Sequence, residues 1–170
     1  MKVFISYHRK DSKQKERLQE LLKSNNISFY SVPDNHNFDG KNHQTIMTML
    51  ASEISKCDVV ICVIGKETYT RPHVDHELHF AFKGDAGVRK GVVAVMLENR
   101  SDSKKNIEKK TFPERLIDNL NYVVVEQYAS IADKLVEAIK KAQVNRKDKM
   151  LQTSHSSPVM QLRAGNYYDM

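Results

Sequence analysis

The sequence predicts an α/β fold in which a five-stranded parallel sheet lies between two layers of helices. Strand-like and helix-like segments alternate along the chain, which is the pattern of parallel strands joined by helical crossovers. The central run CDVVICVIG (57–65) is apolar on both faces, as expected of a strand that helices cover from both sides. The length of 170 residues suits one compact domain.

The first half of the chain predicts two strands and two helices. Residues 2–7 (KVFISY) and 27–32 are rich in the β-branched and aromatic residues that favour strands. Two segments, from about 11 to 24 and from 43 to 55, place apolar side chains three or four positions apart, the spacing of one helix face. Asp11 or Ser12 is placed to cap the first of them. The apolar residues of these helices are Leu18, Leu21, Leu22, Ile46, Leu50 and Ile54.

The second half predicts three strands and two or three helices. Besides the run at 57–65, residues 91–97 and 122–125 are predicted strands. A helix is predicted over about 73–83, and a weaker pattern indicates a short one over 113–119. A closing helix repeats its apolar residues every four positions, at Ile131, Leu135 and Ile139.

We assign residues 1–144 to the domain and residues 145–170 to a C-terminal tail. The tail contains Ser and Thr and shows no clear hydrophobic period. Met160, Tyr167 and Tyr168 are apolar enough to dock on a surface. The sequence leaves open whether that surface belongs to the domain itself or to a partner.

We predict a cytoplasmic protein without a membrane segment. The first residues are strand-like and too short for a secretory signal, and no apolar run approaches the roughly 18 residues of a membrane span. Cys57 and Cys62 lie five residues apart on one predicted strand, too far for a disulfide bond. We expect both to be buried thiols, as in a reducing compartment.

The net charge of +6 raises the question of an anionic partner. The positive residues are spread along the chain, and no zinc-finger or RNA-binding aromatic motif is present. We therefore expect no nucleic-acid partner. A small anion such as a pyrophosphate would benefit equally from the positive field.

Three signatures that would suit an α/β fold are missing. No GxGxxG follows the first strand, so a Rossmann dinucleotide site is unsupported. Gly65-Lys66 lacks the earlier glycine and the following Ser or Thr of a P-loop. The serine hydrolase motif GxSxG is also absent, so the site must be sought elsewhere.

The segment HVDHELHF (73–80) contains three histidines, which raises the question of a zinc site. An HExxH motif would need histidine at position 80, where the chain has Phe80. On a helix, His73 and His79 would point about 120° apart, at 100° per residue, so three histidines would be poorly focused. We therefore predict no metal site.

A helical wheel of the same segment singles out Glu77. It lies beside an arc that should pack on the sheet, and we expect it to be half-shielded near a loop at the carboxyl edge of the strands. A carboxylate so placed is a candidate catalytic group, although a first-turn Glu can also be stabilised by the helix dipole alone. The apolar arc consists of Val74, Leu78, Ala81 and Phe82, and His73, His76 and Phe80 lie on the same arc as Glu77.

The opening KVFISYHRKDS resembles the first strand and loop of TIR and TIR-like domains. The resemblance continues through ISFYSVPD, CDVVICVIG and the helix that carries HELHF, and it covers about residues 1–142. Within that superfamily the chain is most similar to bacterial proteins of the Thoeris anti-phage defence type. The resemblance implies a flavodoxin-like, TIR-type three-layer sandwich.

The resemblance also implies an activity. TIR domains of this type cleave the nicotinamide–ribose bond of NAD and make a cyclic ADP-ribose isomer that activates a separate effector. Glu77 matches their catalytic glutamate, and His73 stands where many members carry an aromatic residue, often Trp. NAD is then the substrate and no cofactor is implied, and a homo-oligomer is expected. The implied substrate-binding residues are Ser6, Tyr7, Arg9, Asp34, Phe38 and His73.

The residue types suit this chemistry, but two alternatives stay open. A carboxylate stabilises the positive charge that develops on the ribose, and Arg9 is placed to hold the pyrophosphate. A TIR-like chain without activity would instead be a self-association scaffold. A nucleoside deoxyribosyltransferase also uses a Glu on a flavodoxin-like sheet. Phe38 contacts either the substrate or a second subunit, or it merely packs on Ile46 or Met47 of its own helix.

Overall fold

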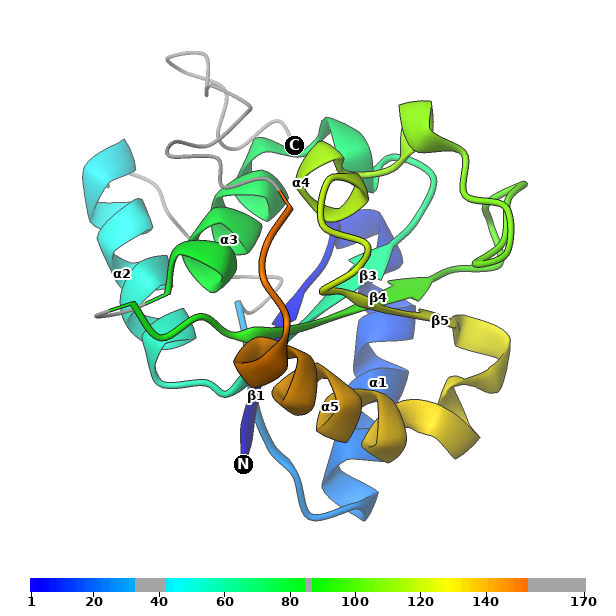
Figure 1. The fold of residues 1–170 in the computed structure, drawn as a ribbon, viewed down its shortest axis with the longest axis horizontal. Coiled ribbons are helices and arrows are strands. Elements are labelled where there is room, and N and C mark those ends of the chain that lie inside the picture. The colour runs from blue at the N-terminus through cyan, green and yellow to red at the C-terminus, as the bar shows by residue number, and fades with distance from the viewer. Residues whose placement is uncertain (33–41, 85–86, 153–170) are drawn as a thin grey trace.

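The computed structural model describes residues 1–32, 42–84 and 87–152, which form a parallel sheet flanked by helices (Figure 1). Its order is β2-β1-β3-β4-β5, and every pairing between neighbours is parallel. The predicted α/β fold with a five-stranded parallel sheet is therefore confirmed. The strands are β1 (Lys2–Ser6), β2 (Ser28–Ser31), β3 (Val59–Ile64), β4 (Gly91–Met96) and β5 (Val124–Gln127).

Two layers of helices cover the sheet. Side chains alternate between the faces of a strand, so Phe4 and Val60 pack on one layer, and Val3 and Ile61 on the other. The first layer contains α2 (His43–Ser55), α3 (Pro72–Lys83) and the short α4 (Glu114–Ile117). The second contains α1 (Ser12–Ser24) and α5 (Ile131–Asp148).

Most predicted elements lie where the hydrophobic pattern placed them, and β5 is the exception. It was expected over residues 122–125 and instead begins at Val124. The amide groups of Tyr122 and Val123 both donate to the carbonyl of Asn119, so these two residues belong to the turn before the strand. Tyr122 is fully buried and its hydroxyl donates to the Lys90 carbonyl at 2.6 Å. Its apolar character reflects a place in the core rather than in the strand.

The last helix extends beyond the predicted domain boundary at residue 144. It continues to Asp148 because Asn145 is buried and its side-chain amide donates to the Tyr122 carbonyl at 2.8 Å. Residues 153–170 of the predicted tail, with its tyrosines, lie outside the described residues.

Cys57 and Cys62 are free and buried, as the sequence predicted. None of the helices in the described part of the chain combines the length and apolar character needed to cross a membrane.

The topology locates the site. In the sheet, β2 lies next to β1 on one flank, and the chain then returns so that β3 lies on the other flank of β1. In open parallel sheets, ligands bind beyond the carboxyl ends of the strands at such a switch point. Here that point lies beyond Ser6 at the end of β1 and Ile64 at the end of β3.

Candidate active site

The start of α3 brings the site residues to the ends of β1 and β3. Pro72 occupies the first helical position, where its missing amide hydrogen has no cost. Val74 and Leu78 bury completely against the sheet, as the helical wheel predicted. This orientation turns Glu77 toward β1.

Glu77 is more enclosed than the sequence suggested. Only 4% of its surface is exposed, whereas half-shielding was expected. The Ser6 hydroxyl donates to Glu77 Oε2 at 2.5 Å. Burial raises the pKa of Glu77 to about 8, against the lowering effect of the Ser6 hydrogen bond. At neutral pH the Glu77 carboxyl group is therefore mostly protonated.

Ser6 contacts Glu77 from within the protein. It is fully buried, so in the described structure its hydroxyl positions the carboxyl group and does not face an open site. Ser6 pairs with Cys62 in the register of β1 and β3. Burial, with a smaller contribution from Glu77, raises the pKa of the Cys62 thiol far above its usual range. Cys62 is therefore a neutral neighbour and not a nucleophile.

Tyr7 and His73 connect the end of β1 to the start of α3. The Tyr7 hydroxyl donates to the Val32 carbonyl at 2.8 Å. His73 Nε2 lies 3.4 Å from the Tyr7 carbonyl oxygen, and because a carbonyl only accepts, this contact assigns the ring proton to Nε2. Burial lowers the pKa of His73 to about 4, so the ring is neutral at pH 7.

The remaining predicted residues are not gathered at Glu77. Arg9 is exposed on the short 3-10 helix Arg9–Asp11 that follows β1, at the rim of the site. Asp34 and Phe38 lie outside the described residues. Of the residues that the resemblance implied, the structure thus brings together four: Ser6, Tyr7, His73 and Glu77.

Asp11 has a role that the sequence did not reveal. It occupies the N-cap position of α1, but its side chain makes no capping hydrogen bond within the described structure. Its buried carboxyl group bonds to Asn99 beyond β4, and burial raises its pKa. A Cβ atom at Gly65, just after β3, would lie 2.4 Å from Asp11 Oδ2. Asp11 therefore joins three loops at the carboxyl edge, and Gly65 permits the approach.

The histidines of α3 serve separate contacts. His76 Nδ1 lies 2.6 Å from the Pro72 carbonyl oxygen. His79 Nδ1 is buried without a hydrogen-bond partner among the described residues, and burial lowers the pKa of this ring to about 4. No group of three His, Cys, Asp or Glu side chains in residues 1–32, 42–84 and 87–152 is arranged to hold a metal ion.

A five-stranded parallel sheet in the order β2-β1-β3-β4-β5 makes the protein a doubly wound, flavodoxin-like α/β domain, and a buried glutamate faces the end of its first strand. The family described as "Thoeris protein ThsB, TIR-like domain" matches residues 4–102, which is more than half of the chain. The chain therefore belongs to the ThsB TIR-like family and is a TIR-domain defence protein.

Other comparisons are more distant. The TIR domains of the activated Roq1 resistosome, which directly recognizes the pathogen effector XopQ, are 17% identical with a TM-score of 0.46. That match covers 85% of this chain and 82% of the Roq1 chain. No curated protein matches the sequence.

Proposed function

We propose that this protein cleaves the nicotinamide–ribose bond of NAD, with Glu77 as the catalytic carboxylate. The observation that carries the proposal is the enclosed Glu77 carboxyl group at the topological switch point, held by the Ser6 hydroxyl at 2.5 Å. Buried carboxyl groups with a raised pKa concentrate at functional sites, and this one lies where ligands of parallel sheets bind.

The electrostatics of Glu77 favour a cationic substrate. Burial raises the pKa of the Glu77 carboxyl group to about 8 and so favours its neutral form. The nicotinamide ring of NAD carries a positive charge, which lowers the pKa of a neighbouring carboxyl group and favours its ionised form. The buried carboxylate then faces the ribose carbon as positive charge develops there.

The bond that breaks joins the ribose C1′ to the nicotinamide nitrogen. Nicotinamide leaves with the bonding electrons as a neutral base, so no general acid is needed. A ring nitrogen or hydroxyl of the remaining ADP-ribose then attacks C1′, and a hydroxyl releases its proton to solvent. The cyclic isomer forms if this group reaches C1′ before water does, which depends on positioning. We propose that this product diffuses to a separate anti-phage effector.

The surrounding residues have distinct proposed roles. Arg9 is exposed and binds the pyrophosphate, because hydrogen bonds between a guanidinium and a phosphate are charge-assisted and stronger than neutral ones. Neutral His73 and the Tyr7 carbonyl shape the wall beside Glu77. Asp34 and Phe38, outside the described residues, complete the proposed substrate contacts. We further propose a cytoplasmic homo-oligomer as the active form.

The test is to incubate the purified chain with NAD and to separate the products by mass and retention time. Release of nicotinamide with a product isomeric to cyclic ADP-ribose is expected, and linear ADP-ribose alone would indicate hydrolysis. Chelator treatment should leave the rate unchanged. No nicotinamide release across a protein dilution series would overturn the proposal. Turnover of deoxyribonucleosides instead of NAD would indicate a deoxyribosyltransferase.

A further inference from the structure

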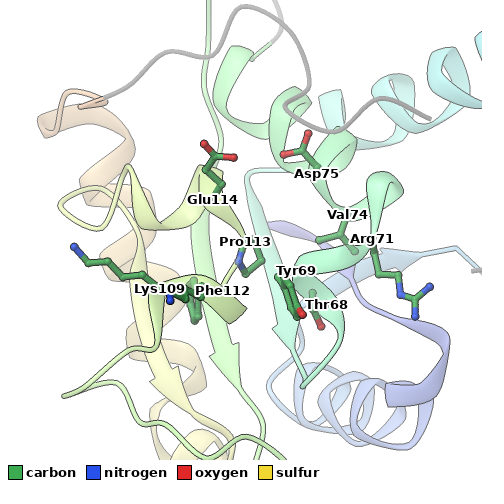
Figure 2. Close-up of a pocket in the computed structure, with 10 residues that line it drawn as sticks. Thr68, Tyr69, Arg71, Val74, Asp75, Lys109, Phe112, Pro113 and Glu114 are labelled. Carbon is green, nitrogen blue, oxygen red and sulfur yellow. The ribbon is translucent and has the colours of Figure 1, made fainter. Parts of the chain in front are cut away.

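A cavity of about 300 Å³ lies beside the start of α3, and Glu77 is not among its lining residues (Figure 2). It is formed by the segment between β3 and α3 and by the loop that precedes α4. Val74 and Asp75 of α3 line it, whereas Glu77 turns to Ser6 on β1. The cavity is therefore separate from the candidate active site.

The middle of the cavity is apolar and aromatic. Figure 2 shows Phe112 and Pro113 on one side, with Tyr69 and Val74 facing them from the other. Tyr69 and Phe112 both line the cavity, although Phe112 is only 3% exposed, and a planar ring gains from stacked or edge-to-face contacts with such side chains.

One wall of the cavity is held rigidly. The Arg100 guanidinium lies over the Phe112 ring, 5.4 Å from its centroid. Arg100 donates to the carbonyl of Thr111 at 2.6 Å and makes two hydrogen bonds of 2.7 Å to the Asp102 carboxylate. Since the Arg100 side chain is only 2% exposed, this network fixes the loop that presents Phe112. The cavity is thus largely pre-formed.

Charged side chains of opposite sign line the two ends of the cavity. In Figure 2 the carboxyl groups of Asp75 and Glu114 lie together at one end, while Lys109 extends from the other. Asp75 is bound by Arg115, whereas Glu114 is exposed and can accept hydrogen bonds from a ligand. Lys110 also lines the cavity and, like Lys109, is exposed.

We propose that this cavity is a second ligand site that binds a mononucleotide. The planar base lies between Tyr69 and Phe112, and the phosphate binds Lys109 and Lys110. Amino or hydroxyl donors of the base or ribose reach Glu114. The volume matches a ligand of this size and is small for a dinucleotide. The site does not depend on NAD cleavage, and its ligand contacts the first turn of the helix that carries Glu77.

Calorimetric titration of the full chain with AMP tests the proposal. We expect one AMP per chain, and at least tenfold weaker binding of adenosine, which lacks the phosphate. The double variant Lys109→Ala/Lys110→Ala should weaken AMP binding about tenfold or more. Lys140→Ala/Lys141→Ala removes the same charge from two adjacent exposed residues of α5 and should leave the affinity unchanged.

Two further variants locate the bound nucleotide. Tyr69→Ala should weaken both AMP and adenosine, because it removes one side of the ring site. Glu77→Gln should bind AMP as the wild type does, whether or not the protein cleaves NAD. The proposal is overturned if AMP does not bind, if Lys109→Ala/Lys110→Ala retains wild-type affinity, or if Glu77→Gln loses AMP binding.

Discussion

Two buried carboxyl groups stand two residues apart on α3 and are stabilised in different ways. Asp75 is bound by the Arg115 guanidinium, with contacts of 3.2 and 3.3 Å to its two oxygens. Glu77, on the other side of the helix, accepts a hydrogen bond from the Ser6 hydroxyl at 2.5 Å. Burial raises its pKa to about 8. One carboxylate is neutralised by an ion pair, and the other is kept neutral by protonation.

The difference distinguishes the roles that we assign to the two carboxyl groups. The Asp75–Arg115 pair links α3 to α4, and disturbing it leaves a buried charge without its partner. Among the described residues no cation pairs with Glu77, which is the basis for proposing that it faces a positively charged ligand. We therefore assign a structural role to Asp75, while the proposed catalytic role belongs to Glu77.

Glu77→Gln should have the largest effect on activity. We expect NAD turnover to fall at least about 100-fold, since an amide cannot stabilise the developing charge as a carboxylate does. Folding should persist. Because the folded pKa is raised from 4.5 to about 8, Glu77 contributes stability at low pH that is lost as the pH rises through 8.

The glutamine variant lacks that loss. Its unfolding temperature should therefore match the wild type at pH 5 and exceed it by a few degrees at pH 9. Thermal unfolding at both pH values, together with NAD consumption, checks the prediction. Retained turnover would end the catalytic assignment, and failure to fold would make Glu77 structural.

Asp75→Asn should have the largest effect on stability. It leaves Arg115 charged and buried, with an expected loss of about 3 kcal/mol in the free energy of unfolding. Asp133→Asn removes an exposed carboxylate from α5 and serves as the control, with little expected change. Urea unfolding measures both variants. If Asp75→Asn is as stable as the wild type, the ion pair contributes nothing beyond what an amide contact would.

Ser6→Ala should shift the pH dependence of turnover. The Ser6 hydrogen bond lowers the pKa of Glu77, so its removal should raise that pKa further. The loss of one hydrogen bond of about 1 kcal/mol corresponds to about 0.7 pKa unit, so the rise of kcat/KM should occur about 0.7 pH unit higher. Ser28→Ala, at an exposed position of β2, is the control. An unshifted profile with a lower rate would give Ser6 a purely structural role.

Arg9→Ala should have the smallest effect. A contact to the pyrophosphate far from the breaking bond contributes equally to substrate and transition state, so KM should rise about three- to tenfold with kcat nearly unchanged. Arg17→Ala, exposed on α1, controls for the loss of charge. A selective fall in kcat would place Arg9 near the reacting ribose.

The sequence predicted the layers of the fold because apolar periodicity is local information. It placed the start of α3 within one residue, but it predicted a half-shielded Glu77, whereas the side chain is only 4% exposed. It could not supply the Ser6–Glu77 bond, which joins residues 71 positions apart, or the Asp75–Arg115 pair, which joins residues 40 positions apart. Such contacts depend on strand register and helix packing.

The position of Asp11 illustrates the same limit. By local pattern it is a helix cap, yet its side chain turns to Gly65 and Asn99. The glycine after β3 was the one sequence feature that permitted this approach. The roles of Asp34 and Phe38 remain predictions, because these residues lie outside the described part of the chain.

The titration of Glu77 itself tests the central claim most directly. In protein labelled with ¹³C at the glutamate carboxyl carbons, the Glu77 signal is identified by its absence in Glu77→Gln. We predict that this signal titrates with a pKa of about 8 in the empty protein, and that a non-cleavable NAD analogue with a cationic ring lowers the value. A pKa near 4.5, unchanged by the analogue, would contradict the account.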